Sequence, residues 1–122
     1  MTDRLSFQSR VKPWMLECFG PGISFDKTER NHRFYEETGE LVQSLGMTRE
    51  EAHQLVDYVF GRPVGEIGQE VGGSIVTLAA FCNAHEIDLG GEAEKELQRV
   101  WEKSDVIRTK QAAKPKHSPL PA

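Results

Sequence analysis

The chain has 122 residues, of which 38% are hydrophobic and 28% are charged, and its formal net charge at pH 7 is −4. This length and balance indicate one globular domain with an ordinary core, and they exclude a disordered chain. The acidic balance also argues against a protein that binds nucleic-acid polymers, because such proteins usually present a basic face.

No part of the sequence resembles a membrane span or a secretory signal. The longest run of low polarity, Ser74 to Cys82, is far shorter than the roughly 20 residues that a spanning helix needs. The first ten residues lack the apolar core of a signal peptide. Two cysteines, Cys18 and Cys82, give no disulfide framework in a chain of this size. We therefore expect a reduced, cytoplasmic protein that makes no membrane contact.

Helical spacing of apolar residues predicts a first helix within residues 1 to 20, which Gly20-Pro21-Gly22 should end. Pro13 must then lie in its first turn or mark a kink, because proline has no N–H to donate within a helix. A second helix should begin near Asp26, or Ser24 before it, as the capping residue, and Gly46 should stop it.

Three further helices are expected in the second half of the chain. Thr48 to Glu51 form a capping box that opens a third helix, and Gly61-Arg62-Pro63 closes it. A fourth should run from about residue 64 to 85 and a fifth from 92 to about 110. The sequence thus predicts an all-α bundle of four or five helices. Residues 1–111 should form a single domain, followed by a disordered, Pro- and Lys-rich tail over residues 112–122.

Four glutamates form two pairs at helical spacing. Glu37 and Glu40 are three residues apart, and Glu66 and Glu70 are four apart, so each pair shares one face of its helix. If the second and fourth helices pack side by side, these carboxylates converge. Close like charges need a cation between them, and Mg²⁺ prefers carboxylate oxygens. The alternative is a solvated face in a chain with 19 acidic residues.

A basic stripe on the fifth helix is a candidate phosphate contact. Lys95, Arg99 and Lys103 recur every fourth residue, so they share a face. The alternative is that they pair with the acidic residues between them, which are Glu92, Glu96 and Glu102.

Two other side chains are candidates for contact with a nucleotide. Arg33 lies one turn before the first acids and could reach a phosphate, while Trp14 could stack on a base or pack in the core. Cys82 and His85 do not amount to a zinc site, because four ligands at recognised spacings are absent.

One stretch and its continuation resemble a known superfamily. The run from Glu36 to Leu41, then Glu70 to Leu78, then Ile87-Asp88, is similar to the MazG-like, all-α nucleoside triphosphate pyrophosphohydrolases. The resemblance covers roughly residues 26 to 103. It implies Mg²⁺ held by Glu-x-x-Glu on one helix and Glu-x-x-Asp on the next. It further implies cleavage of a (deoxy)nucleoside triphosphate to a monophosphate and pyrophosphate, in a homodimer or homotetramer of helical bundles.

Carried over by position, the resemblance makes Glu37, Glu40 and Glu70 metal ligands. Glu66 becomes a fourth candidate ligand, or holds a water, so that Glu40 and Glu66 are the candidate catalytic residues. Gly73 departs from the pattern, because the superfamily has aspartate there. Two hypotheses follow: a working enzyme with an altered site, or a catalytically degenerate helical module of the same fold that binds nucleotides or a partner. Oligomerisation is expected in either case, because so few short helices cannot cover the apolar stripes of the second and fourth.

Overall fold

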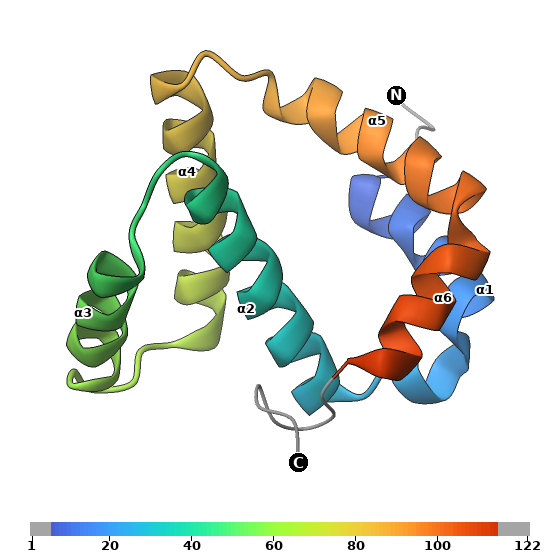
Figure 1. Ribbon diagram of the computed structural model, residues 1–122, viewed down its shortest axis with the longest axis horizontal. Helices are drawn as coiled ribbons and strands as arrows, with labels where there is room; N and C mark the ends of the chain where they lie inside the picture. Colours follow the sequence, from blue (N-terminus) through green and yellow to red (C-terminus); the bar gives the residue numbers. More distant parts are fainter. Residues whose placement is uncertain (1–5, 115–122) are drawn as a thin grey trace. The chain divides into compact units, whose positions relative to one another are not determined.

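The structure, a computed structural model, describes residues 6–114. Within this range the chain is all-helical, as the sequence predicts, and contains no strand (Figure 1). Its six helices are α1 (Phe7–Ser24), α2 (Lys27–Ser44), α3 (Arg49–Phe60), α4 (Ile67–Ala84), α5 (Leu89–Glu102) and α6 (Ser104–Ala113).

The chain divides into two compact units. The described part of unit 1 covers residues 6–38 and 94–114, and unit 2 covers residues 39–93. The boundaries fall inside α2 and α5, so each of these helices contributes one end to each unit.

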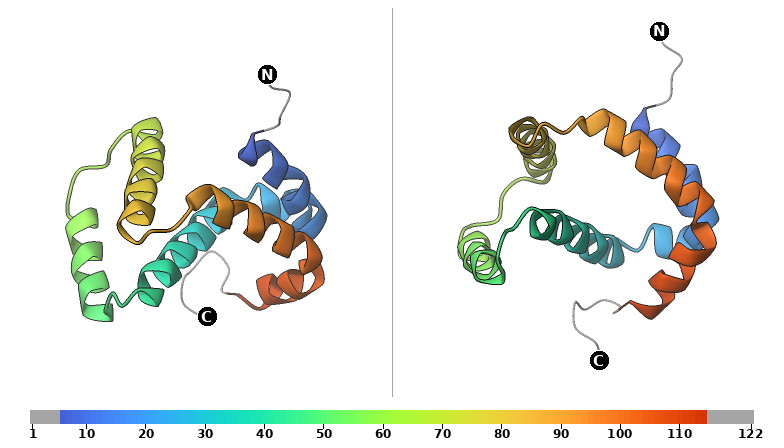
Figure 2. Two further views of the ribbon diagram at one scale, coloured as in Figure 1. Left: turned by 90° about the horizontal axis from the view of Figure 1, so that it is seen from above. Right: turned by 45° about the horizontal axis from the view of Figure 1, so that its top comes forward.

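Unit 1 is built around the packing of α1 against α6, two helices from opposite ends of the described chain (Figure 2). Cys18 of α1 is 1% exposed and Leu97 of α5 is 9% exposed. The indole of Trp14 meets the ring of Phe19 edge to face, with ring centroids 5.5 Å apart. The core of unit 1 therefore lies between α1 and the C-terminal helices.

Unit 2 has much less of a core. Its helices α3 and α4 run in opposite directions and are joined by the non-helical residues 61–66 (Figure 1). Cys82 is the one apolar residue of unit 2 that is buried. Most of the apolar side chains on α3 and α4 are exposed.

The expected ends of the second and third helices are confirmed. The Asp26 carboxylate accepts a hydrogen bond from the backbone N–H of Glu29 at 3.1 Å, which caps α2. Gly46 follows α2 with a φ of 95°, a left-handed conformation that glycine adopts without strain. Thr48 and Glu51 form both bonds of the predicted capping box at the start of α3.

The prediction that Gly20-Pro21-Gly22 ends the first helix is confirmed in part. Gly20 leaves helical geometry, with φ 76° and ψ 167°, but the chain turns helical again and α1 continues to Ser24. The restart is possible because Pro21 occupies the first position of the new segment, where a missing N–H costs nothing. Pro13 lies in the interior of α1, past the first turn, and Gly20 is the position where the helix is interrupted.

The expected fifth helix is two helices, which makes six in the described chain instead of four or five. α5 ends at Glu102 and α6 begins at Ser104. The hydroxyl of Ser104 lies 3.1 Å from the carbonyl oxygen of Val100 and 3.2 Å from that of Trp101. A serine that bonds the preceding turn in this way competes with the helical backbone pattern.

Two smaller boundaries also differ from expectation. α4 begins at Ile67, three residues later than predicted, and α6 extends to Ala113, so the first two residues of the predicted tail are helical. The rest of that tail, residues 115–122, lies outside the described residues, as do residues 1–5.

Candidate functional site

The first acidic pair lies on α2. Glu37 and Glu40 are both exposed and stand one turn apart, with Gly39 between them. A Cβ at Gly39 would meet no atom within 4 Å. The helix surface beside the two carboxylates is therefore open. The boundary between the two units passes between the acids, because Glu37 belongs to unit 1 and Glu40 to unit 2.

The second acidic pair lies at the N-terminus of α4. Glu66 is the capping residue: its carboxylate accepts hydrogen bonds from the backbone N–H of Gly68 at 2.9 Å and of Gln69 at 2.8 Å. These two bonds lower the pKa of Glu66. Glu70 lies in the first helical turn, where the helix dipole favours a negative charge. Glu66 is thus held as a carboxylate, and both of its oxygens already accept bonds from the backbone.

The carboxylate of Glu70 lies over Gly65. A Cβ at Gly65 would collide with the Glu70 side chain, so the glycine allows this close approach. By contrast, a Cβ at Gly73, where the superfamily has aspartate, would meet nothing within 4 Å. The position can therefore accept a larger side chain without displacing a neighbour in the described chain.

The acids do not form a complete metal site in the described residues. Among residues 6–114, no three Asp, Glu, His or Cys side chains lie close enough together to hold a metal ion. The donor chemistry of the four glutamates suits Mg²⁺. The predicted set is also divided, since Glu37 lies in unit 1 and Glu40, Glu66 and Glu70 lie in unit 2.

One residue of the basic stripe lies near one of the acids. Arg99 of α5 donates two hydrogen bonds to Glu96, at 2.8 and 2.6 Å. The pKa of Arg99 is raised, first by the hydrogen bond and charge of Glu96 and then by the charge of Glu37 on α2. Arg99 therefore pairs with Glu96 within α5, as one interpretation expected, and it also feels the charge of the candidate metal ligand Glu37. Lys95 lies one turn before Arg99 on the same exposed face.

The two candidate nucleotide contacts in unit 1 are engaged within the protein. Arg33 is largely buried, and its guanidinium lies 3.1 Å from Glu29 and 2.8 Å from Glu36. The indole N–H of Trp14 donates to the backbone oxygen of Val100 at 3.0 Å. Trp14 therefore joins α1 to α5, in agreement with its core-packing interpretation, while both ion pairs of Arg33 lie within α2.

A buried polar cluster around Glu29 was not apparent from the sequence. Glu29 is 5% exposed and accepts a hydrogen bond from Gln111 of α6, which is 6% exposed. The neighbouring Arg30 lies 5.3 Å above the ring of Phe19, and burial lowers the pKa of its guanidinium. The spacing of Glu29 and Arg33 was a visible signal for an ion pair within α2. Nothing in the sequence indicated Gln111 as the third member.

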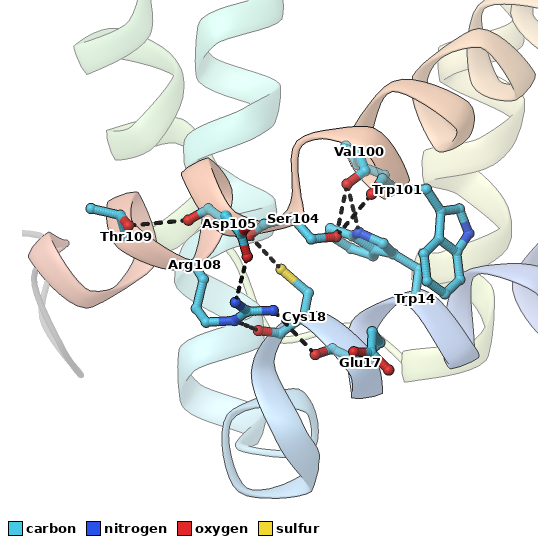
Figure 3. A network of polar contacts seen from close by, with 9 residues as sticks. All are labelled: Trp14, Glu17, Cys18, Val100, Trp101, Ser104, Asp105, Arg108 and Thr109. Carbon is cyan, nitrogen blue, oxygen red and sulfur yellow. Dashed lines mark hydrogen bonds and ion pairs between the residues drawn. The ribbon is translucent and has the colours of Figure 1, made fainter.

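A second polar network, also missed, joins α6 to α1 (Figure 3). Arg108 donates to the backbone oxygen of Cys18 at 2.7 Å and to the Asp105 carboxylate at 2.9 Å. It thereby ties α6 to the backbone of α1 two residues before the interruption at Gly20. The Cys18 thiol bonds the backbone oxygen of Ser104 at 3.5 Å, and burial raises its pKa.

A cavity of about 390 Å³ lies beside this network, between α1 and α6. It is lined by Leu16, Glu17, Cys18, Phe19, Gly20, Ile23, Arg108, Gln111 and Ala112. Two of its polar residues are engaged, since Arg108 donates to the backbone oxygen of Cys18 and Gln111 donates to the Glu29 carboxylate.

No protein-family model matches the chain, and neither a curated protein nor a solved structure is detectably similar to it. In residues 6–114, none of the helices combines the length and the apolar character that a membrane crossing requires.

Proposed function

We propose that the chain is a MazG-like, magnesium-dependent pyrophosphohydrolase, which cleaves a nucleoside triphosphate to a monophosphate and pyrophosphate. It acts in the cytoplasm as a homodimer or homotetramer. The all-helical fold is compatible with this assignment. The two free thiols of Cys18 and Cys82 suit a reducing compartment.

The electrostatic influence of Glu37 on the pKa of Arg99 is the observation that carries the proposal. These residues come from α5 and α2, yet the charge of Glu37 acts on the Arg99 guanidinium. A triphosphate bound through a divalent cation needs carboxylates for the cation and a guanidinium or ammonium for its remaining oxygens. Glu37, Arg99 and Lys95, which lies one turn before Arg99, would supply both kinds of group within unit 1.

In this proposal Glu37, Glu40 and Glu70 hold Mg²⁺, and Lys95 or Arg99 binds phosphate oxygens. Bound Mg²⁺ neutralises charge on the phosphates and lowers the pKa of a coordinated water. Glu66 could orient that water only after giving up at least one of its two capping bonds to α4. Neither Trp14 nor Arg33 is needed, because both are engaged within unit 1.

A second function is favoured by Gly73. Without the aspartate of the superfamily pattern, the site lacks one acidic ligand, and the chain could be a helical module that binds nucleotides or a partner without hydrolysis. The open space around Gly73 makes the two functions separable. Gly73→Asp places the missing carboxylate on the face of Glu70 with no clash in the described chain.

Pyrophosphate release by wild type and Gly73→Asp, from a panel of ribo- and deoxyribonucleoside triphosphates with and without Mg²⁺, tests the assignment. Mg²⁺-dependent release by the wild type supports the enzyme. Release by Gly73→Asp alone supports the degenerate module. Gly73→Asn, which has the same size but no charge, is the matched control. Release by neither protein with any triphosphate contradicts the enzymatic proposal.

A further inference from the structure

Arg30 of α2 carries two buried donor atoms that form no hydrogen bond. Its Nε and Nη2 are buried, and neither has a hydrogen-bond partner among residues 6–114. Burial is also the main cause that lowers the pKa of this guanidinium. Buried polar groups in folded proteins are almost always hydrogen-bonded, because a buried group without a partner is costly, and more so when it is charged. The two atoms therefore point to a partner outside the described chain.

The geometry of a guanidinium restricts what that partner is. Nε–H and one N–H of Nη2 lie side by side in the guanidinium plane and point in the same direction. Such a fork matches two oxygens of one carboxylate or phosphate group, which accept two parallel hydrogen bonds from it. The free edge of Arg30 therefore suits an oxyanion.

The acidic groups around Arg30 are engaged elsewhere. Glu29 binds Arg33 and Gln111, and Asp26 accepts a hydrogen bond from the backbone N–H of Glu29. The charges of both acids act on Arg30, although neither acid accepts a bond from Nε or Nη2. These two negative charges repel a doubly charged phosphate more strongly than a singly charged carboxylate. The surroundings thus favour a monoanion.

An apolar space lies next to this cation. The Arg30 guanidinium is 5.3 Å from the centre of the Phe19 ring. Phe19 also lines the cavity of about 390 Å³ between α1 and α6, together with the apolar side chains of Leu16, Ile23 and Ala112. A volume of this size is typical of a site for a small ligand. All of these residues belong to unit 1.

We propose that Arg30 anchors a binding site for a small organic acid in unit 1. Nε and Nη2 donate to the two oxygens of its carboxylate, and the cavity beside Phe19 holds its apolar part. Since Nε and Nη2 are buried, a local rearrangement of side chains admits the carboxylate. The site uses none of the residues assigned to Mg²⁺ or to phosphate, and it requires no hydrolysis.

Calorimetric titration of the full-length protein with sodium hexanoate tests the site. Acetate and inorganic phosphate are compared with hexanoate at the same ionic strength. We expect hexanoate to bind at least about tenfold more tightly than acetate, because its additional CH₂ groups leave water in the cavity. Phosphate should bind more weakly than hexanoate, because of the neighbouring acids.

Arg30→Met keeps an unbranched apolar side chain but removes the donors. It should weaken hexanoate binding at least about tenfold, since two hydrogen bonds to a charged group are lost. Arg10→Met is the matched control. It makes the same change at another arginine of unit 1, whose guanidinium already donates two hydrogen bonds to Glu94. This control should leave the affinity for hexanoate unchanged.

A measurement on the wild type alone covers the case in which Arg30→Met fails to fold. In ¹⁵N-labelled protein, the Nε–H resonance of Arg30, assigned through its own side chain, should shift as hexanoate is added, and that of Arg10 should not. Hexanoate binding that Arg30→Met leaves unchanged, or an Arg30 resonance that no carboxylate shifts, would overturn the inference. Equal affinities for acetate and hexanoate would contradict the role of the cavity, and tighter binding of phosphate would contradict the carboxylate.

The triphosphate assay proposed above separates this site from the proposed function. Hexanoate binding by a protein that releases no pyrophosphate upholds the site and contradicts the enzyme. Hydrolysis by a protein that binds no carboxylate does the opposite.

Discussion

The side-chain amide of Gln111 on α6 donates a hydrogen bond to the buried carboxylate of Glu29 on α2. The same carboxylate oxygen lies 3.1 Å from the guanidinium of Arg33. An amide and a guanidinium therefore compensate a negative charge that is almost fully removed from water. This arrangement joins α2 to α6 within unit 1.

Glu29→Ala should destabilise the protein by about 3 kcal/mol, because it leaves the largely buried Arg33 without a main partner. Glu36→Ala is the matched control: Glu36 also pairs with Arg33, but its side chain is 35% exposed, so the expected loss is below about 1 kcal/mol. Urea unfolding followed by circular dichroism measures both values. Equal losses for the two variants would contradict the role assigned to Glu29.

Gly20→Ala should destabilise α1 by roughly 1 to 2 kcal/mol, because the φ of 76° at this position is strained for any residue with a Cβ. No atom lies within 4 Å of a Cβ there, so the whole effect comes from the backbone. Gly22→Ala, in the helical segment that follows, has equal space and should stabilise by about 0.5 to 1 kcal/mol. Thermal unfolding of the two variants tests whether their changes in stability have opposite signs. A loss of stability in both variants would contradict this prediction.

Trp14→Phe should lower stability by about 1 kcal/mol through loss of the hydrogen bond to Val100, while an aromatic ring still faces Phe19. Because Trp14 is engaged in the core of unit 1, nucleotide affinity should stay the same. Denaturant unfolding and nucleotide titration on the same preparation measure the two effects. Unchanged stability with weakened nucleotide binding would instead identify Trp14 as a base contact.

Glu66 should make α4 sensitive to acid. Its pKa is lowered in the folded chain by the two capping bonds, relative to about 4.3 in the unfolded chain. The stabilisation is therefore complete above the unfolded pKa and is lost as the pH falls through the lower folded value. Glu66→Gln keeps an acceptor oxygen but loses the titration. The stability difference between wild type and Glu66→Gln should shrink on going from about pH 6 to pH 3. A difference independent of pH would show that the cap does not depend on ionisation.

Local signals in the sequence were sufficient for the helical class and for several helix ends. The Asp26 cap, the Thr48 capping box and the stop at Gly46 depend on residues a few positions apart, which explains why they were predictable. The continuation of α1 past Gly20 could not be predicted in this way. Pro21 is typical both of a position that ends one helix and of the first position of another. The break before Ser104 was not predicted either, because a serine can bond the preceding turn without ending a helix.

In the candidate site, too, features that depend on neighbouring residues were predictable and features that depend on packing were not. Positions of Glu37 and Glu40 on one helix face follow from spacing, and so does the Glu96 pairing of Arg99. The capping role of Glu66 depends on where α4 begins, and helix ends are the least predictable feature of a sequence. The ion pair of Glu29 and Arg33 also follows from spacing, whereas the hydrogen bond that Gln111 adds to Glu29 depends on how α6 packs on α2.

The products formed from a nucleoside triphosphate test the central claim most directly. Wild type and Glu40→Gln are compared with Mg²⁺ and with a chelator, and nucleoside monophosphate and pyrophosphate are quantified together. The account predicts equal amounts of the two products from wild type with Mg²⁺, and none from Glu40→Gln or after chelation. Release of inorganic phosphate with a diphosphate, or equal activity of Glu40→Gln, would contradict it.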